Sequence, residues 1–512
     1  MAINDQTDLA LKYHDGTKHP GGSLMDRFHA FDPSQPPLLH KTYLSVETVP
    51  LSLGEQRLHA PALEAIAALG PPVGAAVAPR FEDVSTILHL SAGITRRITR
   101  DWGEYTFRAA ACTGALYHIE LYIVCADLPG LKAGVYHYDV AESSLDRLRD
   151  GDFRGDLADA CGNRRSVAEA PLSIVYTDVV WRNAVKYQAR EYRHAFWDSG
   201  TIIANTLAVC SGLGMSAEVI AGFVDGAVSH LVGADMEREL PVAVVPVGHG
   251  SAAPPPRAEG PLGFETVPIA DHHPTIPAVT EMHSASALDT PRQVAEWQRS
   301  HLDAPDTPPG SPSVPLEPGA MDRAPVLDLQ RVIERRGSSR QFSREAIGFA
   351  QLSTALATAT RGVAADYSGG GSVMWRAFLI VNAVDGLAPG AYAFDRDAAG
   401  LKLLREGDFR LEAGSLSLGQ ALAADSAVNI YLIADLPAVL KRYGNRGYRA
   451  AQLDSAITAG KLYLAAYAQR FGATGLTFFD DAVTEFFSPE AAGLSVMFLM
   501  ALGHRQRTVP SR

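Results

Sequence analysis

A polar, tyrosine-rich segment that occurs twice constrains this chain more than any other feature. One copy, VKYQAREYRHAFWDS, spans residues 185–199, and the other, KRYGNRGYRAAQLDS, spans residues 441–455. Aligned without a gap, the two share the frame Tyr-x-x-Arg-x-Tyr-Arg-x-Ala-x-x-Asp-Ser at an offset of 256 residues, half of the 512-residue chain. Gly-Asp-Phe-Arg recurs at the same offset, at 151–154 and 407–410. The sequence therefore predicts an internal tandem duplication, with one copy of a domain in each half.

Length and composition agree with two domains of ordinary size. At 512 residues and 47% hydrophobic, the chain can bury two separate cores. Its net charge of -12 and its pI near 5.7 disfavour nucleic acid and acidic membrane surfaces as partners. The first residues lack a charged-then-apolar signal pattern, and no stretch has the length and apolarity of a membrane span. We therefore expect a soluble, cytoplasmic protein.

The cysteines give no sign of a metal site or of a disulfide framework. All of them stand singly, without the close spacing of zinc sites or of small disulfide-bonded domains. We expect four free thiols that serve packing: Cys112, Cys125, Cys161 and Cys210.

A proline-rich join separates the two copies. Residues 250–325 hold 15 of the 32 prolines, a composition that favours extended, poorly packed chain. The join also contains one plausible helix, PRQVAEWQRSHL at 291–302, and aromatic residues such as Trp297 that an inert linker would not need. Two interpretations stay open, a linker and an excursion that wraps a neighbouring part. The expected organisation is a first domain with an N-terminal extension at 1–250, the join at 251–323 and a second domain at 324–512.

Each copy is predicted to be an α+β domain. Apolar runs at 119–124 (IELYIV) and 376–381 (RAFLIV) are short enough to be buried strands. In the second half, helices are predicted over 327–336 and 346–360, and the alanine-rich stretch 451–472 predicts a long buried helix that stops at Gly472. Helices around a modest antiparallel sheet are therefore expected twice.

Three stretches carry residues suited to binding. RRGSSRQF at 335–342 offers arginines and serines for a phosphate or a polyol, although a solvated helix end is the alternative. A glycine turn precedes each predicted strand, where small residues let backbone approach a flat ring or a phosphate; a mobile loop is the alternative. A third glycine turn, at 472–476, could present N–H groups to a ring heteroatom or be a simple connection. None fits Gly-x-Gly-x-x-Gly after a strand, so a Rossmann site is not expected.

In this order and combination, the stretches resemble the nitroreductase superfamily. The resemblance rests on Arg336-x-Ser338-x-Arg340-x-Phe342, on the turn at 113–120, on Lys-Tyr-x-x-Arg-x-Tyr-Arg and on Gly-Leu-Gly before an apolar strand. Within the superfamily, the chain is similar to the SagB-type or McbC-like dehydrogenases associated with thiazole and oxazole formation in peptide natural products. The opening YHDGTKH, at 13–19, adds to this similarity. The resemblance covers nearly the whole chain outside the join, and it implies FMN as cofactor.

The resemblance also accounts for the duplication. Superfamily members are usually homodimers with FMN at the subunit interface, so a tandem chain implies an intramolecular pseudo-dimer that could act as a monomer. The halves are unequal, because the first half lacks the Arg-x-Ser-x-Arg pattern near Arg80 and closes on PVGHGS where the second closes on ALGHRQR. We therefore expect one FMN per chain. The implied cofactor contacts are Arg336, Ser338, Arg340 and Arg505 for the phosphate, Thr113, Gly114 and Ala115 across the interface, and Thr474, Gly475 and Leu476 beside the ring.

The repeated segment supplies candidate catalytic residues by the same resemblance. In azoline dehydrogenases an adjacent Lys-Tyr pair in such a segment is associated with proton removal from the ring carbon, and Lys186-Tyr187 matches it. A desolvated lysine can act as a base and a tyrosine can relay a proton. The second copy has Arg442 before Tyr443, and arginine cannot act as that base. The sequence does not decide which copy faces the flavin, so Tyr443 remains a candidate. The alternative for both copies is a structural bond to a carboxylate such as Asp198.

Two classes of function remain open. The leading class is an FMN-dependent oxidoreductase, either a dehydrogenase that oxidises azoline rings in a peptide or an NAD(P)H-dependent reductase of nitroarenes or quinones. The other class is a flavin-binding scaffold or sensor without chemistry of its own. The expected partner is accordingly a peptide or another small molecule.

Overall fold

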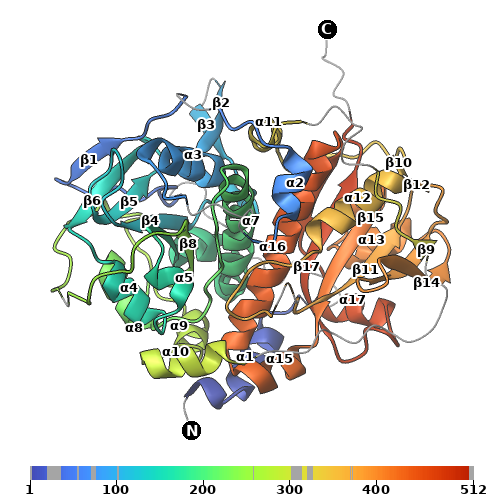
Figure 1. Ribbon diagram of the computed structural model, residues 1–512. Coiled ribbons are helices and arrows are strands. Elements are labelled where there is room, and N and C mark those ends of the chain that lie inside the picture. Colours follow the sequence, from blue (N-terminus) through green and yellow to red (C-terminus); the bar gives the residue numbers. More distant parts are fainter. Residues whose placement is uncertain are drawn as a thin grey trace.

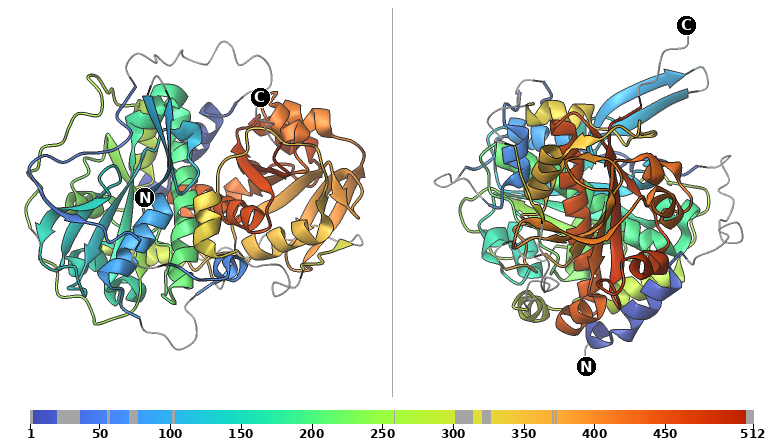
Figure 2. Two further views of the ribbon diagram at one scale, coloured as in Figure 1. Left: turned by 90° about the horizontal axis from the view of Figure 1, so that it is seen from above. Right: turned by 90° about the vertical axis from the view of Figure 1, so that its right-hand side faces the viewer.

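The structure, a computed structural model, contains two α+β halves that repeat one arrangement (Figure 1). It describes residues 3–19, 36–54, 57–70, 77–100, 103–257, 259–300, 314–319, 327–369, 371 and 373–506. Parts of the predicted join, residues 258, 301–313 and 320–323, therefore lie outside the described residues. The two halves lie side by side, and the long helices α7 (Glu191–Gly212) and α16 (Arg446–Ala468) run next to each other between them (Figures 1 and 2).

The two sheets share a strand order, which confirms the predicted fold class. In the first half the core order is β6-β5-β4-β7-β8, and in the second it is β14-β13-β11-β15-β17, with every neighbouring pair antiparallel. The predicted strands are β4 and β11, each central in its sheet. The first-half strands are β1 (Glu47–Pro50), β2 (Ile94–Arg100), β3 (Gly103–Arg108), β4 (Ile119–Cys125), β5 (Gly134–Asp139), β6 (Ser144–Asp150), β7 (Leu172–Val179) and β8 (Glu239–Val247). The later strands are β9 (Val314–Pro315), β10 (Ile347–Gly348), β11 (Arg376–Val381), β12 (Val384–Asp385), β13 (Gly390–Asp395), β14 (Gly400–Glu406), β15 (Val428–Ala434), β16 (Gly472–Leu476) and β17 (Ser495–Gly503).

Helices cover both sheets and fill the space between them (Figure 1). Up to the join, the further helices are α1 (Asp8–Gly16), α2 (Ala62–Ala67), α3 (Phe81–Ala92), α4 (Arg154–Ala160), α5 (Arg165–Ala168), α6 (Val180–Tyr187) and α8 (Asp225–Val232). From the join onward they are α9 (Pro277–Ala285), α10 (Pro291–Gln298), α11 (Leu329–Arg335), α12 (Phe349–Ala359), α13 (Arg410–Leu416), α14 (Ala421–Asp425), α15 (Leu436–Tyr443) and α17 (Asp480–Phe486). The predicted helix stop at Gly472 is wrong by four residues. Helix α16 ends at Ala468, the chain turns at Arg470 with φ of 68°, and Gly472 begins β16.

Small residues let the two central helices approach closely. A Cβ placed on Gly200 of α7 would lie 2.4 Å from the Cβ of Ala456, and one placed on Gly460 of α16 would lie 2.5 Å from the Cβ of Ala204. Each contact joins a residue to its own counterpart at the 256-residue offset, so both lie where the two copies meet. The predicted pseudo-dimer therefore has its pseudo-twofold axis between these two helices.

The tyrosine-rich segments clamp the two halves together. Both arginines of each segment bind one buried aspartate in the opposite half: Arg190 and Arg193 bind Asp480, and Arg446 and Arg449 bind Asp225. All six side chains are at most 5% exposed. Burial alone would raise the pKa of Asp225, but the two guanidinium groups lower it to about 2. The repeated frame thus forms reciprocal ion pairs, since each copy supplies two arginines to an aspartate of the other half.

The N-terminus and the join pack onto the same interface. The backbone N–H of Asn445 donates to the carbonyl oxygen of Asn4 at 2.7 Å, and the carbonyl oxygen of His283 in α9 accepts from Arg449 at 2.7 Å. Trp297 of α10 is 5% exposed. Of the two interpretations of the join, its described part therefore favours an excursion that wraps the halves.

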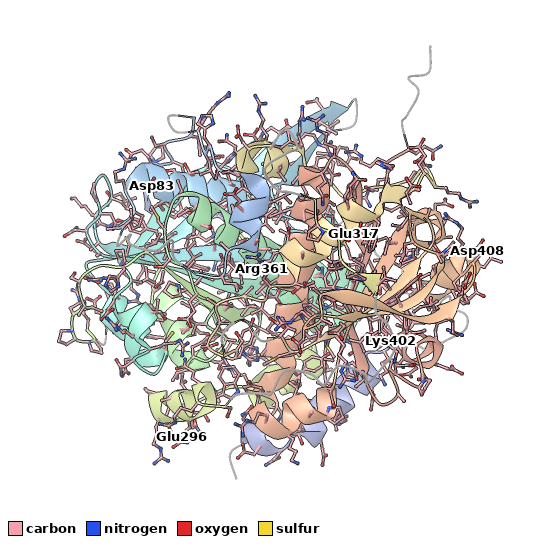
Figure 3. All side chains as sticks on the ribbon, turned by 45° about the vertical axis from the view of Figure 1, so that its right-hand side comes forward. Asp83, Glu296, Glu317, Arg361, Lys402 and Asp408 are labelled. Atoms are coloured by element: carbon pink, nitrogen blue, oxygen red, sulfur yellow. The ribbon has the colours of Figure 1, made fainter. Side chains whose placement is uncertain are left out.

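Charged side chains are spread over the surface. Glu296, Glu317, Arg361 and Asp408 are exposed and lie on different parts of the view in Figure 3. Within the described ranges, no helix has the length and apolarity needed to span a membrane.

We expect Gly200→Ala to destabilise the protein by about 1–3 kcal/mol, because the added methyl group overpacks the contact with Ala456. Gly226→Ala in α8 is the matched control, since a Cβ there meets nothing within 4 Å and the same change in an open helix stabilises by about 0.5–1 kcal/mol. Adding Ala456→Gly to Gly200→Ala should recover part of the loss. Guanidinium denaturation measures all three variants, and equal effects of Gly200→Ala and Gly226→Ala would contradict the close approach.

Candidate functional site

The Arg-Ser-Arg stretch lies beside β16 in the second half. Ser338 forms a parallel bridge with Ala473, and the Ser339 N–H donates to the carbonyl oxygen of Ala473 at 2.9 Å. The hydroxyl group of Tyr463, on α16, lies 3.1 Å from Ser338 Oγ and accepts from the Gly475 N–H at 2.6 Å. One tyrosine thus links the predicted phosphate stretch to the predicted ring-facing strand.

The arginines of this region differ in what they bind. Arg336 reaches into the first half, where its Nε and Nη2 donate to the carbonyl oxygens of Ala109 and Arg108 at 2.9 and 2.8 Å. Arg340 is exposed and has no ion-pair partner among the described residues. Arg505 donates from Nη1 to the Tyr467 hydroxyl group at 3.3 Å. The three guanidinium groups therefore come from two neighbouring segments of the second half, and one of them ties the halves together.

Asp198 fixes the first-half turn at Thr113–Ala115. Its carboxylate accepts from the Thr113 N–H at 2.8 Å, from Thr113 Oγ1 at 2.9 Å and from Cys112 Sγ at 3.0 Å. Gly114 and Ala115 have φ of 65° and 56°, a left-handed backbone that requires such an anchor for the alanine. The aspartate of the repeated frame thus shapes the turn that the sequence assigned to the cofactor.

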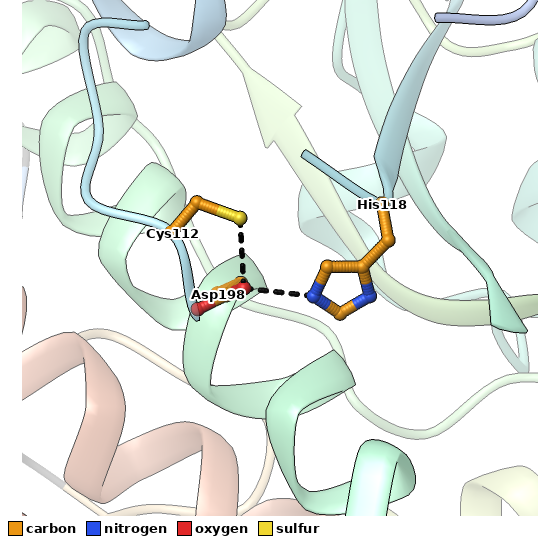
Figure 4. A group of neighbouring side chains, drawn as sticks. All are labelled: Cys112, His118 and Asp198. Carbon is orange, nitrogen blue, oxygen red and sulfur yellow. Dashed lines mark hydrogen bonds and ion pairs between the residues drawn. The ribbon is translucent and has the colours of Figure 1, made fainter. Parts of the chain in front are cut away.

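Figure 4 shows His118 beside Asp198, and the same imidazole also binds a second buried carboxylate. Its Nε2 lies 2.7 Å from Asp198 and its Nδ1 lies 2.6 Å from Asp178, with Glu191 3.8 Å away. Burial alone would lower the pKa of His118, but the two aspartates raise it to about 9. Burial and Asp178 raise the pKa of Glu191 well above its usual value. Cys112, His118 and Asp198 have the residue types of a metal site, with ligand atoms within 4.8 Å, and here hydrogen bonds already connect them.

The Lys186-Tyr187 pair lies against this turn. A Cβ placed on Gly114 would be 2.9 Å from the Tyr187 hydroxyl oxygen, so only glycine permits the approach. The tyrosine ring packs edge-on against His194, and Lys186 Nζ lies 5.2 Å from the ring centroid. Burial raises the pKa of Tyr187, Asp198 raises it further, and Arg340 of the second half lowers it. The structure therefore brings the first-copy pair together with the turn and with Arg340.

The structure separates Tyr443 from this group. Tyr443 is 1% exposed, and its hydroxyl group donates to the carbonyl oxygen of Tyr367 at 2.8 Å. The indole of Trp297 covers it at a centroid distance of 5.5 Å. Asp454, the counterpart of Asp198, accepts from the Met374 N–H at 2.9 Å. Within the described residues, neither aspartate of the frame forms an ion pair with a lysine; each holds backbone or a neighbouring side chain.

Sequence reasoning missed several residues of this group. Asp198 carried a signal, because it belongs to the repeated frame. Tyr463 and Tyr467 lie four residues apart on a helix and so share one face, which is a weaker signal. His118 carried none, because its partners come from 60 and 80 residues away.

Comparisons with known proteins agree with the duplicated fold. The profile of the nitroreductase family matches residues 78–249 and 333–504, once in each half. The chain belongs to the nitroreductase family. Its fold is similar to that of the crystal structure of a putative nitroreductase from Anabaena variabilis. The TM-score between the two is 0.76, at 24% identity over 97% of this chain and 99% of that one. The family assignment confirms the resemblance seen in the sequence and makes an oxidoreductase the supported class.

Three relatives align with parts of the chain. A putative nitroreductase of Methanocaldococcus jannaschii is 25% identical over 33% of this chain and 80% of its own length. The microcin B17-processing protein McbC of Escherichia coli is 25% identical over 26% of this chain and 50% of its own length. The trifolitoxin-processing protein TfxB of Rhizobium leguminosarum bv. trifolii is 31% identical over 22% of this chain and 32% of its own length. The chain thus covers half or less of the two peptide-processing relatives.

We expect His118→Met, which copies Met374 of the second half, to flatten the alkaline pH dependence of stability. The folded-state pKa of about 9 lies above the usual 6.5, so the charged imidazole stabilises below pH 6.5 and this contribution is lost as pH rises through 9. The parent should lose about 3 kcal/mol of unfolding free energy over that range through this group. The variant should be less stable at pH 6.5 and lack this loss.

Denaturant titrations at pH 6.5 and pH 9.5 measure the difference. The half-exposed His249 provides a control, because His249→Met should keep the parent's slope. Equal slopes for the parent and His118→Met would show that the aspartates do not hold a charged imidazole.

Proposed function

We propose that this chain is an FMN-dependent oxidoreductase with one flavin site, formed between the Arg336–Arg340 stretch and β16 of the second half and the Thr113–Ala115 turn and Tyr187 of the first. The observation that supports it most is the reach of Arg336 from the cationic stretch to the carbonyl oxygens beside the first-half turn. Because the domain is duplicated within one chain, a site between the halves corresponds to a site at the interface of a dimer.

The residues present fit a flavin phosphate. Arg336 keeps its Nη1 without a hydrogen-bond partner among the described residues, and Arg340 is exposed close to the same segment. Charge-assisted bonds from guanidinium groups suit a phosphate dianion. These cations gather in a chain whose net charge is -12, which supports the proposal that they bind an anion.

Glycines let β16 pack closely against the segments that surround the proposed site. A Cβ on Gly472 would meet Ser339 Oγ at 2.3 Å and Arg505 Cγ at 2.5 Å, and one on Gly475 would lie 3.2 Å from Phe498. Glycine at these positions keeps the backbone open to close neighbours. When bound, FMN supplies the hydride chemistry. The chain's own residues would hold the phosphate and the ring, with β16 on the second-half side and the Lys186-Tyr187 pair on the first-half side.

For the reaction, we propose oxidation of azoline rings in a peptide. The similarity to McbC and TfxB, whose names describe processing of microcin B17 and trifolitoxin, supports a peptide substrate. Lys186, half-buried beside Tyr187, is the group we assign to remove the carbon-bound proton as hydride leaves. Tyr187 would orient the ring or relay the proton. The second candidate is an NAD(P)H-dependent nitroarene or quinone reductase, which the M. jannaschii relative favours.

We expect the purified protein to carry about one FMN per chain, and Arg340→Ala to weaken FMN retention at least tenfold, because it removes a charge-assisted bond worth about 1.5–3 kcal/mol. Arg336→Ala should lose as much FMN and some stability, since Arg336 also ties the halves. Arg80→Ala is the matched control, an exposed arginine of the first half that should retain FMN. Flavin released by denaturation and quantified by absorbance decides the matter, and two FMN per chain would refute the single site.

Substitution of Lys186 distinguishes the two reactions. If the chain oxidises azolines, Lys186→Ala should keep its flavin spectrum and lose at least about a hundredfold in rate, since a placed base contributes about 10²–10⁴. The exposed Lys441 is the matched control and should tolerate the same change. If the chain reduces nitroarenes or quinones, no carbon acid is deprotonated and Lys186→Ala should stay within a few fold of the parent. Flavin loss in Lys186→Ala would instead assign this lysine to the cofactor.

A further inference from the structure

The proposed flavin site has a pseudo-symmetric counterpart between the halves, and the sequence offset locates it. The 256-residue offset relates β4 to β11, β7 to β15 and β8 to β17. The edge strand β16 corresponds to residues 217–220, because the pairs Ala217–Val247 and Ile220–Val244 match Gly472–Gly503 and Gly475–Met500 at an offset of 255 in this strand. The counterparts of Leu476 and Thr477 are therefore Ala221 and Gly222.

An indole ring occupies this position. Trp297, from the join, lies between Tyr443, the counterpart of Tyr187, and Gly222. Its Nε1 donates to the carbonyl oxygen of Tyr443 at 2.9 Å, and a Cβ placed on Gly222 would lie 2.7 Å from its Cε3. Tyr443 is 1% exposed while Tyr187 is only half-buried. A flat aromatic group of the chain itself thus covers the second tyrosine.

At the same position, a carboxylate accepts the hydrogen bonds of two backbone N–H groups. Asp366 accepts from the N–H groups of Ala221 and Gly222 at 2.9 and 2.8 Å, and Gln298, next to Trp297, donates to it at 3.1 Å. Counted back from β4 and β11, Asp366 corresponds to Ala110, which has no polar side chain. The two backbone donors that face Asp366 here therefore have counterparts, at Leu476 and Thr477, with no such carboxylate in sequence register.

The main chains of the two halves also bond to each other beside this position. The Val219 N–H donates to the carbonyl oxygen of Ala364 at 2.8 Å, and the Asp366 N–H donates to that of Val219 at 3.0 Å. In the proposed flavin site, by contrast, the side chain of Arg336 spans the distance between the corresponding parts of the two halves. Main-chain hydrogen bonds therefore join the two halves directly beside the second position, where a side chain joins them beside the first.

We propose that this second position is a flavin site occupied by the chain itself, with the indole of Trp297 in place of the ring and the carboxylate of Asp366 in place of the ring's hydrogen-bonding edge. The proposal rests on the proposed function, because it takes the first position to hold FMN. It assigns a role to the join, because Trp297 of α10 fills the position that a cofactor ring would otherwise occupy. It also gives the reason for a single FMN per chain, which loss of the first-half arginines alone does not.

The test uses the FMN-loaded full chain and lumiflavin, a flavin ring without phosphate. In equilibrium dialysis the parent should bind no lumiflavin beyond its FMN, and Trp297→Gly/Asp366→Ala should bind about one per chain. Trp375→Gly, which removes a buried tryptophan of the second-half core, is the matched control for an unrelated cavity and should bind none. A folded double variant that binds no lumiflavin, or a parent that carries two FMN, would overturn the proposal. A parent that carries no FMN would refute the proposed function instead.

The single variant keeps the test valid should the double variant not fold. Trp297→Gly should lower the Tm by roughly 5 °C or more, and millimolar indole should restore at least half of that loss, because the vacated space has the shape of the missing ring. Indole should leave the parent's Tm unchanged. A Tm loss that indole does not repair would show that Trp297 does not fill a ring-shaped site.

Discussion

Buried ion pairs between the two halves fix the position of one half against the other. Each tyrosine-rich segment offers two arginines to one aspartate of the other half, and none of these six groups has enough contact with water to stay charged alone. Removing one partner of such a pair costs about 3–5 kcal/mol, because the other charge is left uncompensated. The halves can therefore meet in only one way. Every distance across the candidate site, from Arg336 to the first-half carbonyls and from Tyr187 to Arg340, depends on that registration.

The clamp is symmetric, whereas the residues around it are not. His118 bridges two carboxylates in the first half, and its counterpart Met374 offers only a backbone N–H to Asp454. Arg336 has no equivalent near Arg80. The polar groups around the candidate site thus come from both halves, and their counterparts in the other half are apolar or absent. The interface uses the arginines that both copies share, whereas the candidate site includes residues such as His118 and Arg336 that only one half has.

Much of this architecture follows from the sequence. The offset predicted two α+β domains facing each other, and the apolar runs predicted β4 and β11, since both depend on local pattern. The Arg336 stretch was predicted as an anion site because its residue types suit an anion. The role of Trp297 was not, because its contacts with Tyr443 and Gly222 join segments 146 and 75 residues away. The different surroundings of Tyr187 and Tyr443 were equally hidden, since both lie in the same frame and Trp297, which covers Tyr443, comes from the join.

The covalent connection between the halves has a consequence for how this chain can change. In a homodimer one gene encodes both subunits, so any substitution appears at both sites and a gain at one cannot be separated from a loss at the other. Here the same position exists as two independent codons, 256 residues apart. Assembly also does not fall with dilution, because the partner domain is always at the effective concentration that the tether sets. A chain of this kind can devote one interface position to binding and the other to rigidity, a division of labour that identical subunits cannot reach.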